Sequence, residues 1–221
     1  RVQAHDAQTE TCTLTVRPRP MVTRMVHDAH FPAYTRLAPR PGQSGGDIVA
    51  PPGTSIALQI ESSIPLKKAW LQFDETTRLS ARVDGHTARV EFTITENQRY
   101  TVGLLDPHQI PNKDPVTYRI VSLEDRPPEV RLLRPGRDSE LGESMQVALL
   151  AEAHDDYGVA QMQVRYQITD DPEEHVLPIP LTTIAKEQTQ NHTWDLSALT
   201  LLPGDQVTYR VRAYDNNNIS G

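Results

Sequence analysis

Apolar and polar residues alternate along most of this chain. The alternation is clearest in TSIALQIES (54–62), KKAWLQFDE (67–75), AQMQVRYQI (160–168) and QVTYRVRAYD (206–215). A period of two places successive side chains on opposite faces, as in a half-buried β-strand. No window shows the 3.6-residue stripe of an amphipathic helix. The pattern therefore predicts an all-β protein, built from strands of five to nine residues in antiparallel sheets.

A hairpin is predicted within SARVDGHTARVEFTI (80–94), where two alternating runs flank Asp84-Gly85. Asp-Gly is a strong signal for a two-residue turn, because a type I′ turn needs positive φ at both central positions. We expect the chain to reverse at this dipeptide.

One phrase recurs three times. It reads RVQAHD at 1–6, YTVGLLD at 100–106 and RVRAYD at 210–215, and its aspartates Asp6, Asp106 and Asp215 are 100 and 109 residues apart. An interval near 100 residues matches one immunoglobulin-type β-sandwich. We interpret the phrase as the penultimate strand of each repeating module.

The repeat gives a domain map. Residues 1–18 are interpreted as the last strand or two of a preceding module, residues 19–125 as one immunoglobulin-like β-sandwich, and residues 126–221 as a second that lacks its final strand. The predicted fold class is thus all-β, with tandem immunoglobulin-like sandwiches. The proline-rich boundaries RPRP (17–20) and RPP (126–128) predict stiff, extended connections between modules.

Composition narrows the function. The formal net charge of −7 argues against nucleic acid as a partner, because its binders concentrate Lys and Arg on one face. It also gives no attraction to anionic lipid, so we expect no direct membrane contact within this segment. The single cysteine, Cys12, allows no internal disulfide. No run of 18 apolar residues and no signal peptide is visible.

The most suggestive polar clusters are AEAHDDYGV (151–159) and AYDNNNISG (213–221). Asp155, Asp156, Asp215 and Asn216 follow predicted strands and face the loop end of a sandwich. Calcium takes six to eight oxygen ligands, which clustered Asp and Asn residues supply. The alternative is that these side chains cap turns by accepting hydrogen bonds from nearby backbone N–H groups. The sequence leaves both interpretations open and predicts no other cofactor.

The chain shows no nucleophile elbow, phosphate-binding loop or zinc-hydrolase helix, so we predict that it is not an enzyme. His27 and His30 have helical metal-pair spacing, but on a strand their rings would point to different faces. A carbohydrate-binding or accessory module of a secreted enzyme is the alternative function. Such a module needs a row of exposed aromatic side chains, and the chain has only two Trp and three Phe.

Two resemblances add to this interpretation. LSALTLLPGDQVTYRVRAYDNNNISG (196–221) resembles the end of a fibronectin type III or related bacterial immunoglobulin-like domain, with Tyr209 at the position of the tyrosine corner and Tyr100 one module earlier. Trp70 and Trp194 are then expected core aromatics, one per sandwich.

The second resemblance spans residues 20–221. FPAYTRL (31–37), GGDIVAPPGTSIALQI (45–60), DDYGV (155–159) and PPEVRLLRP (127–135) are similar to an uncharacterised family of large bacterial proteins. In that family, membrane-anchored chains carry several such sandwiches in tandem outside the cytoplasm. The resemblance implies an extracytoplasmic, periplasmic or cell-surface location for a membrane-anchored parent. It supplies no reaction and no catalytic residues.

These observations predict a non-enzymatic scaffold or adhesion-stalk segment whose partner is a protein or another cell-envelope component. If residues 1–18 are a strand without its own domain, an exposed strand edge would be a template for it. We therefore predict that Thr11–Arg17 pairs with an exposed edge of another copy of the chain, by strand exchange.

Overall fold

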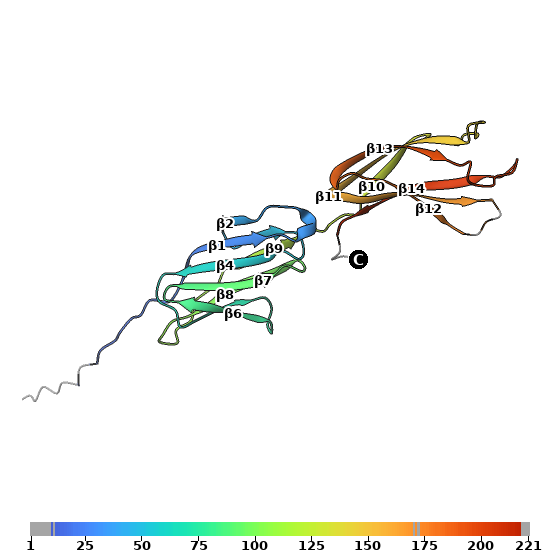
Figure 1. Ribbon diagram of the computed structural model, residues 1–221. Helices are drawn as coiled ribbons and strands as arrows, with labels where there is room; N and C mark the ends of the chain where they lie inside the picture. Colours follow the sequence, from blue (N-terminus) through green and yellow to red (C-terminus); the bar gives the residue numbers. More distant parts are fainter. Residues whose placement is uncertain (1–9, 11, 170, 172, 218–221) are drawn as a thin grey trace, which may run out of the picture.

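The computed structural model describes residues 10, 12–169, 171 and 173–217. In these residues the chain forms two β-sandwiches arranged end to end, with residues 12–19 leading away from the outer end of the first (Figure 1). The all-β prediction of immunoglobulin-like sandwiches is confirmed, since the only described helix is a single 3-10 turn, η1 (Ala33–Thr35). No helix in the described part of the chain has the length and apolar character to cross a membrane.

The first sandwich is formed by one continuous sheet that folds over into two layers. Its strands are β1 (Val22–His30), β2 (Arg40–Ser44), β3 (Ile48–Ala50), β4 (Ser55–Ser62), β5 (Lys68–Gln72), β6 (Arg78–Asp84), β7 (Thr87–Thr93), β8 (Gln98–Leu105) and β9 (Thr117–Ser122). They follow the order β2-β1-β4-β7-β6-β5-β8-β9-β3. β6 pairs with β7 through its second half and with β5 through its first, which carries the sheet from one layer to the other.

Alternation fixes the first core. On β4, Ile56, Leu58 and Ile60 are buried while the residues between them are partly exposed, which is the predicted period of two. On β8, the Tyr100 ring is buried and its hydroxyl donates to the Gly46 carbonyl at 2.6 Å. That bond joins β8 to the segment before β3, so the Tyr100 hydroxyl does not bond back to its own turn as a tyrosine corner would.

The predicted hairpin is present but displaced by one residue. Asp84 is the last residue of β6 and pairs with Thr87, so the two turn residues are Gly85 and His86. Gly85 has φ +58°, which a residue without Cβ adopts at no steric cost. Glycine therefore takes the first central position of the turn, and Asp84 stays in the ladder.

The second sandwich is built around one long strand. Its elements are β10 (Glu129–Arg134), β11 (Gln146–Ile168), β12 (His175–Ile179), β13 (Ala185–Asp195) and β14 (Val207–Asp215). The first part of β11 pairs with β10 and β13, and its second part pairs with β12 and β14. One strand thus belongs to both layers, and β11 is far longer than the five to nine residues predicted.

The bend of β11 explains this length. The register with β13 shifts between His154 and Val159, and Gly158 there has φ +144°. The Asp155 carboxylate accepts hydrogen bonds from the backbone N–H groups of Tyr157 and Gly158. Because these N–H groups are satisfied locally, the chain turns from one layer to the other at Gly158 while β11 stays paired on both sides of the bend.

The two tryptophans have different environments. Trp194 is 4% exposed and packs in the second core against Tyr166 and Tyr209, as predicted. Trp70 is only half-buried, because it lies on the opposite face of β5 from Ala69 and Leu71 and covers Gly103 of β8. The expectation that Trp70 is a core residue is therefore wrong.

Two of the three repeated phrases lie on strands of the two sandwiches. Residues 100–106 lie on β8 and just beyond it, and residues 210–215 lie on β14. β8 pairs antiparallel with β5, and β14 pairs antiparallel with β11. β8 also pairs with β9, whereas β14 pairs with β11 alone among the described strands. The first phrase, including Asp6, lies outside the described residues.

The segment before the first sandwich has no strand structure in its described part, residues 12–19. Leu14 and Val16 are highly exposed, and the Arg17 guanidinium contacts the His108 ring at 2.7 Å. Thr11 lies outside the described residues. Pairing of Thr11–Arg17 with a second copy involves two chains, so it stays a prediction, as do the domain boundaries at residues 18 and 125.

Candidate functional site: the joint between the sandwiches

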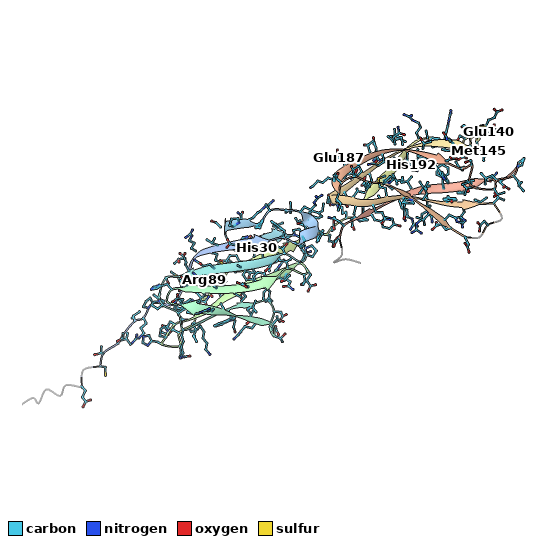
Figure 2. The ribbon with its side chains drawn as sticks, in the orientation of Figure 1. His30, Arg89, Glu140, Met145, Glu187 and His192 are labelled. Carbon is cyan, nitrogen blue, oxygen red and sulfur yellow. The ribbon has the colours of Figure 1, made fainter. Side chains whose placement is uncertain are left out.

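The two segments that carried the family resemblance, FPAYTRL and DDYGV, meet where the sandwiches adjoin. We call this region the joint and define it by the residues that contact one another or interact electrostatically there: Tyr34, Arg36, Asp125, Asp155, Asp156, Tyr157, Ile184, Asp215, Asn216 and Asn217. Figure 2 helps to place it, since Glu187 lies at the same end of the second sandwich and Glu140 and Met145 lie at the opposite end.

The first sandwich contributes Tyr34 through η1. β1 ends at His30, and Pro32 begins the 3-10 turn, where the Thr35 hydroxyl donates to the Pro32 carbonyl at 2.8 Å. Arg36 then takes a left-handed conformation, φ 57°, which ends the turn after one cycle. Tyr34 is held on this projecting turn and is 8% exposed although it belongs to neither hydrophobic core.

An aromatic pair forms the centre of the joint. The Tyr34 ring meets the Tyr157 ring edge-on, with centroids 5.5 Å apart and an interplanar angle of 87°. Lys186 lies over the Tyr157 ring at 5.9 Å. An edge-to-face pair contributes about 0.5–1.5 kcal/mol beyond its buried area. This contact joins η1 of the first sandwich to the bend of β11 in the second.

Hydrogen bonds cross the joint beside the rings. The Asn216 side-chain amide donates to the Tyr34 carbonyl at 2.8 Å, and the Asn217 amide donates to Asp125 Oδ2 at 2.6 Å. The Arg36 guanidinium donates to the Ile184 carbonyl. The end of β14 and the segment that connects the sandwiches are thereby tied to the same place.

Acidic residues gather around these contacts. Burial raises the pKa of Asp125, with further increases from the negative charges of Asp155, Asp215 and Asp156, against a lowering by the Asn217 hydrogen bond. Burial likewise raises the pKa of Tyr34 to about 12, and Asp125 and Asp215 add to the effect. The joint therefore combines several negative charges with restricted access to solvent.

The four predicted calcium candidates divide in the structure. Asp155 is 2% exposed, and Asn216 has a buried side-chain oxygen, so both lie within the joint. Asp215 is half-buried, and its Oδ1 accepts from the Asn217 backbone N–H at 3.0 Å, as a turn cap does. Asp156 is exposed. The structure thus brings together two of the four at buried positions and adds Asp125 and Tyr34, which the sequence analysis did not select.

Four buried side-chain oxygens have no hydrogen-bond partner in the described part of the chain, and all belong to the joint: Tyr34 Oη, Asp125 Oδ1, Asp155 Oδ2 and Asn216 Oδ1. Buried polar atoms are normally paired, so four together at one place need an explanation. No group of three or more His, Cys, Asp or Glu side chains that could hold a metal ion occurs within residues 12–169, 171 or 173–217.

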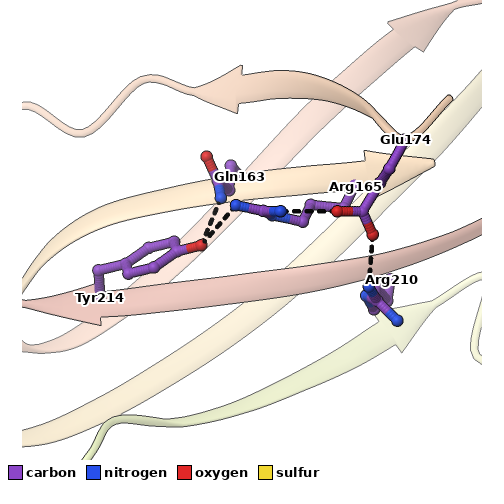
Figure 3. A network of polar contacts seen from close by, with 5 residues as sticks. All are labelled: Gln163, Arg165, Glu174, Arg210 and Tyr214. Carbon is purple, nitrogen blue, oxygen red and sulfur yellow. Dashed lines mark hydrogen bonds and ion pairs between the residues drawn. The ribbon is translucent and has the colours of Figure 1, made fainter.

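A second polar cluster lies on the outer face of β11, β12 and β14 (Figure 3). Glu174 accepts from Arg165 at 2.6 Å and from Arg210, and the Tyr214 hydroxyl contacts Arg165 at 3.1 Å and the Gln163 amide at 2.6 Å. These bonds tie the segment before β12 to its neighbours across β11. Every group in the network has a partner, so its role is to hold the strands together.

This cluster predicts a shifted titration of Glu174. The hydrogen bond from Arg165 lowers the pKa of Glu174 from its usual 4.5. Because the folded pKa is lowered, the stabilisation is present above the ordinary pKa and is lost as pH falls through the folded value. We expect an NMR titration of the Glu174 carboxyl to give a midpoint below 4.5, and Arg165→Gln to return it toward 4.5. A smaller return is expected for Arg210→Gln; an unchanged midpoint in Arg165→Gln would contradict the assignment.

Two surface hollows in the described part of the chain have no Phe, Trp or Tyr side chain in their lining. One of about 400 Å³ is lined by the charged and polar residues of β10, β11 and β13, namely Glu129, Arg131, Glu152, Ala153, His154, Glu187, Gln188 and Thr189. Among the described residues, the exposed large apolar side chains are Leu, Val, Ile and Met. No observation here specifically favours the carbohydrate-binding alternative.

No family model and no curated protein matches the chain. Solved structures that match include the fibronectin(III)-like modules of Clostridium thermocellum CbhA, with 15% sequence identity over 78% of this chain and 82% of theirs and a TM-score of 0.26.

Proposed function

We propose that this chain is a structural segment, a stiff two-sandwich spacer or scaffold, of a larger extracytoplasmic protein, and that it catalyses no reaction. The observation that carries the proposal is the joint. A ring pair and side-chain hydrogen bonds from both sandwiches converge there, whereas a flexible tether would leave the two cores free to reorient. A joint of this kind transmits orientation from one module to the next.

The surroundings of the joint support the same role. The segment between β9 and β10 is short, contains Pro127-Pro128, and is tied by Asp125 to Asn217. Proline restricts the backbone of a connection and keeps it extended. A bacterial, membrane-anchored parent and a protein or cell-envelope partner belong to this proposal because the sequence resemblance implies them.

The test is the distance between the sandwiches. Spin labels are placed at Glu91→Cys on β7 and Thr193→Cys on β13, both exposed, with Cys12→Ser to remove the native thiol. Pulsed electron paramagnetic resonance should give one narrow distance distribution. Tyr34→Ala removes the ring contact and should broaden the distribution about twofold, because small interfaces between domains otherwise permit relative motion.

Trp70→Ala is the matched control, since it removes a half-buried ring from the outer face of the first sandwich without touching the joint. Its distribution should equal that of the parent. A broad distribution in the parent chain itself would show that the sandwiches reorient freely and would overturn the proposed scaffold role.

A further inference from the structure

Three buried acceptor oxygens of the joint lack a donor among the described residues, and the Tyr34 hydroxyl beside them is also unpaired. Asp125 uses one carboxylate oxygen to accept from Asn217, and Asp155 uses one to accept from two backbone N–H groups. The second oxygen of each, Asp125 Oδ1 and Asp155 Oδ2, is buried without a partner, as is Asn216 Oδ1. Asp155 as a whole is 2% exposed. Turn capping satisfies one oxygen of Asp155, and the Asn217 amide satisfies one oxygen of Asp125. The other oxygen of each carboxylate has no hydrogen-bond partner among the described residues.

Two cationic side chains at the joint, Arg36 and Lys186, contact other groups. The Arg36 guanidinium bonds to the Ile184 carbonyl, and Lys186 lies over the Tyr157 ring. The negative charges of Asp155, Asp215 and Asp156 each add to the raised pKa of Asp125, after burial. Buried carboxylates are normally paired with a positive charge or coordinate a metal.

We propose that the joint binds a divalent cation, calcium, through the free oxygens of Asp125, Asp155 and Asn216. These ligands are all oxygen, without thiolate or imidazole, which suits a hard cation and disfavours zinc or copper. Calcium tolerates irregular geometry and completes six to eight ligands with backbone carbonyls and water. The site has only two carboxylates and one amide among its side-chain ligands, which is consistent with the lack of any group of three or more His, Cys, Asp or Glu in the described residues.

The position of the ligands gives the cation a mechanical effect. Asp125 lies in the connection between the sandwiches, Asp155 at the bend of β11, and Asn216 just after β14. The Asn216 amide nitrogen also donates to the Tyr34 carbonyl of the first sandwich. A cation held by these groups would link the connection to the second sandwich and orient the residue that reaches the first. This inference rests on the proposed scaffold function and adds control of its stiffness by calcium.

Calorimetric titration of calcium chloride into the chelator-treated chain, residues 1–221 at physiological ionic strength, tests the site directly. We expect a Kd of about 10⁻⁴–10⁻³ M, the range of extracellular calcium modules. Calcium should also raise the melting temperature and narrow further the spin-label distance distribution, which the contacts of the joint already keep narrow without the cation. Asp125→Asn and Asp155→Asn should each weaken binding at least about tenfold, since affinity follows the number of charged ligands.

Asp205→Asn is the matched control, because Asp205 is an exposed residue that caps the turn before β14. The calcium affinity of this variant should equal that of the parent chain. Asp125→Asn keeps the test valid if Asp155→Asn disturbs folding, because Asp125 is only half-buried. No heat and no change in melting temperature at several millimolar calcium overturn the proposal, as does equal binding of magnesium chloride. A narrow distance distribution without calcium binding overturns the cation site alone. Calcium binding with a broad distribution overturns the scaffold role alone.

Discussion

Trp194→Ala is expected to destabilise the second sandwich by about 3–5 kcal/mol, the usual loss for a buried Trp. Trp194 is 4% exposed on β13, and its ring contacts those of Tyr166 at 4.8 Å and Tyr209 at 5.5 Å. Alanine leaves a cavity between β11, β13 and β14 that these rings cannot fill. Because a domain of this size is stable by only about 5–15 kcal/mol, the loss is a large part of the total.

The first sandwich should be unaffected, since the two hydrophobic clusters share no residue. The chain has two Trp, so in Trp194→Ala the only remaining tryptophan is Trp70. Its fluorescence then reports the unfolding of the first sandwich alone. In urea, the fluorescence midpoint should stay at its parent value while circular dichroism shows an earlier transition. Trp194→Phe, which keeps a ring, should lose less. If the Trp70 signal moves with the early transition, the sandwiches unfold as one unit and the two cores are not independent.

The period of two accounts for how much of the fold was predictable. Alternation on β4, β5 and β14 fixes which face is buried, because a slip of one residue would expose every apolar side chain. The same pattern does not predict that β11 runs through both layers. Alternation continues across a bend whenever the backbone groups there find local partners, and at this bend Asp155 supplies them. The sequence pattern thus predicts that the strands exist but not where they end.

The joint was only partly predictable for a different reason. Asp155 and Asn216 were selected because they end strands in polar clusters. Asp125 and Tyr34 lie in segments with no periodic pattern, and their contacts join positions 92 and 182 residues apart. Local sequence does not encode which loops meet at the ends of two modules. One signal in the sequence could have indicated Asp125, which directly precedes the Arg126-Pro127 boundary. A charged residue next to a stiff connection is held close to the place where the two sandwiches adjoin.

On the outer face of the first sandwich, Gly103→Ala should lower stability when the Trp70 ring is present and raise it when the ring is removed. Trp70 and Gly103 are direct cross-strand partners on β5 and β8, and a Cβ built on Gly103 would lie 2.0 Å from the Trp70 ring. Gly103→Ala must therefore displace the ring, which also stacks beneath Arg78 at 4.5 Å. We expect a loss of about 1–3 kcal/mol, the usual cost of inserting a methyl group into a packed site.

Removing the ring should reverse that result. In the Trp70→Ala background the space above Gly103 is open, and alanine then stabilises the strand by about 0.5–1 kcal/mol, because glycine loses more conformational freedom on folding. The four chains of this cycle, compared by urea denaturation, isolate the ring–glycine contact. A loss of the same size in both backgrounds would mean that the backbone at Gly103, and not the Trp70 ring, excludes a side chain. The sign change is expected because the three atoms nearest to the added methyl group all belong to a ring that the second substitution deletes.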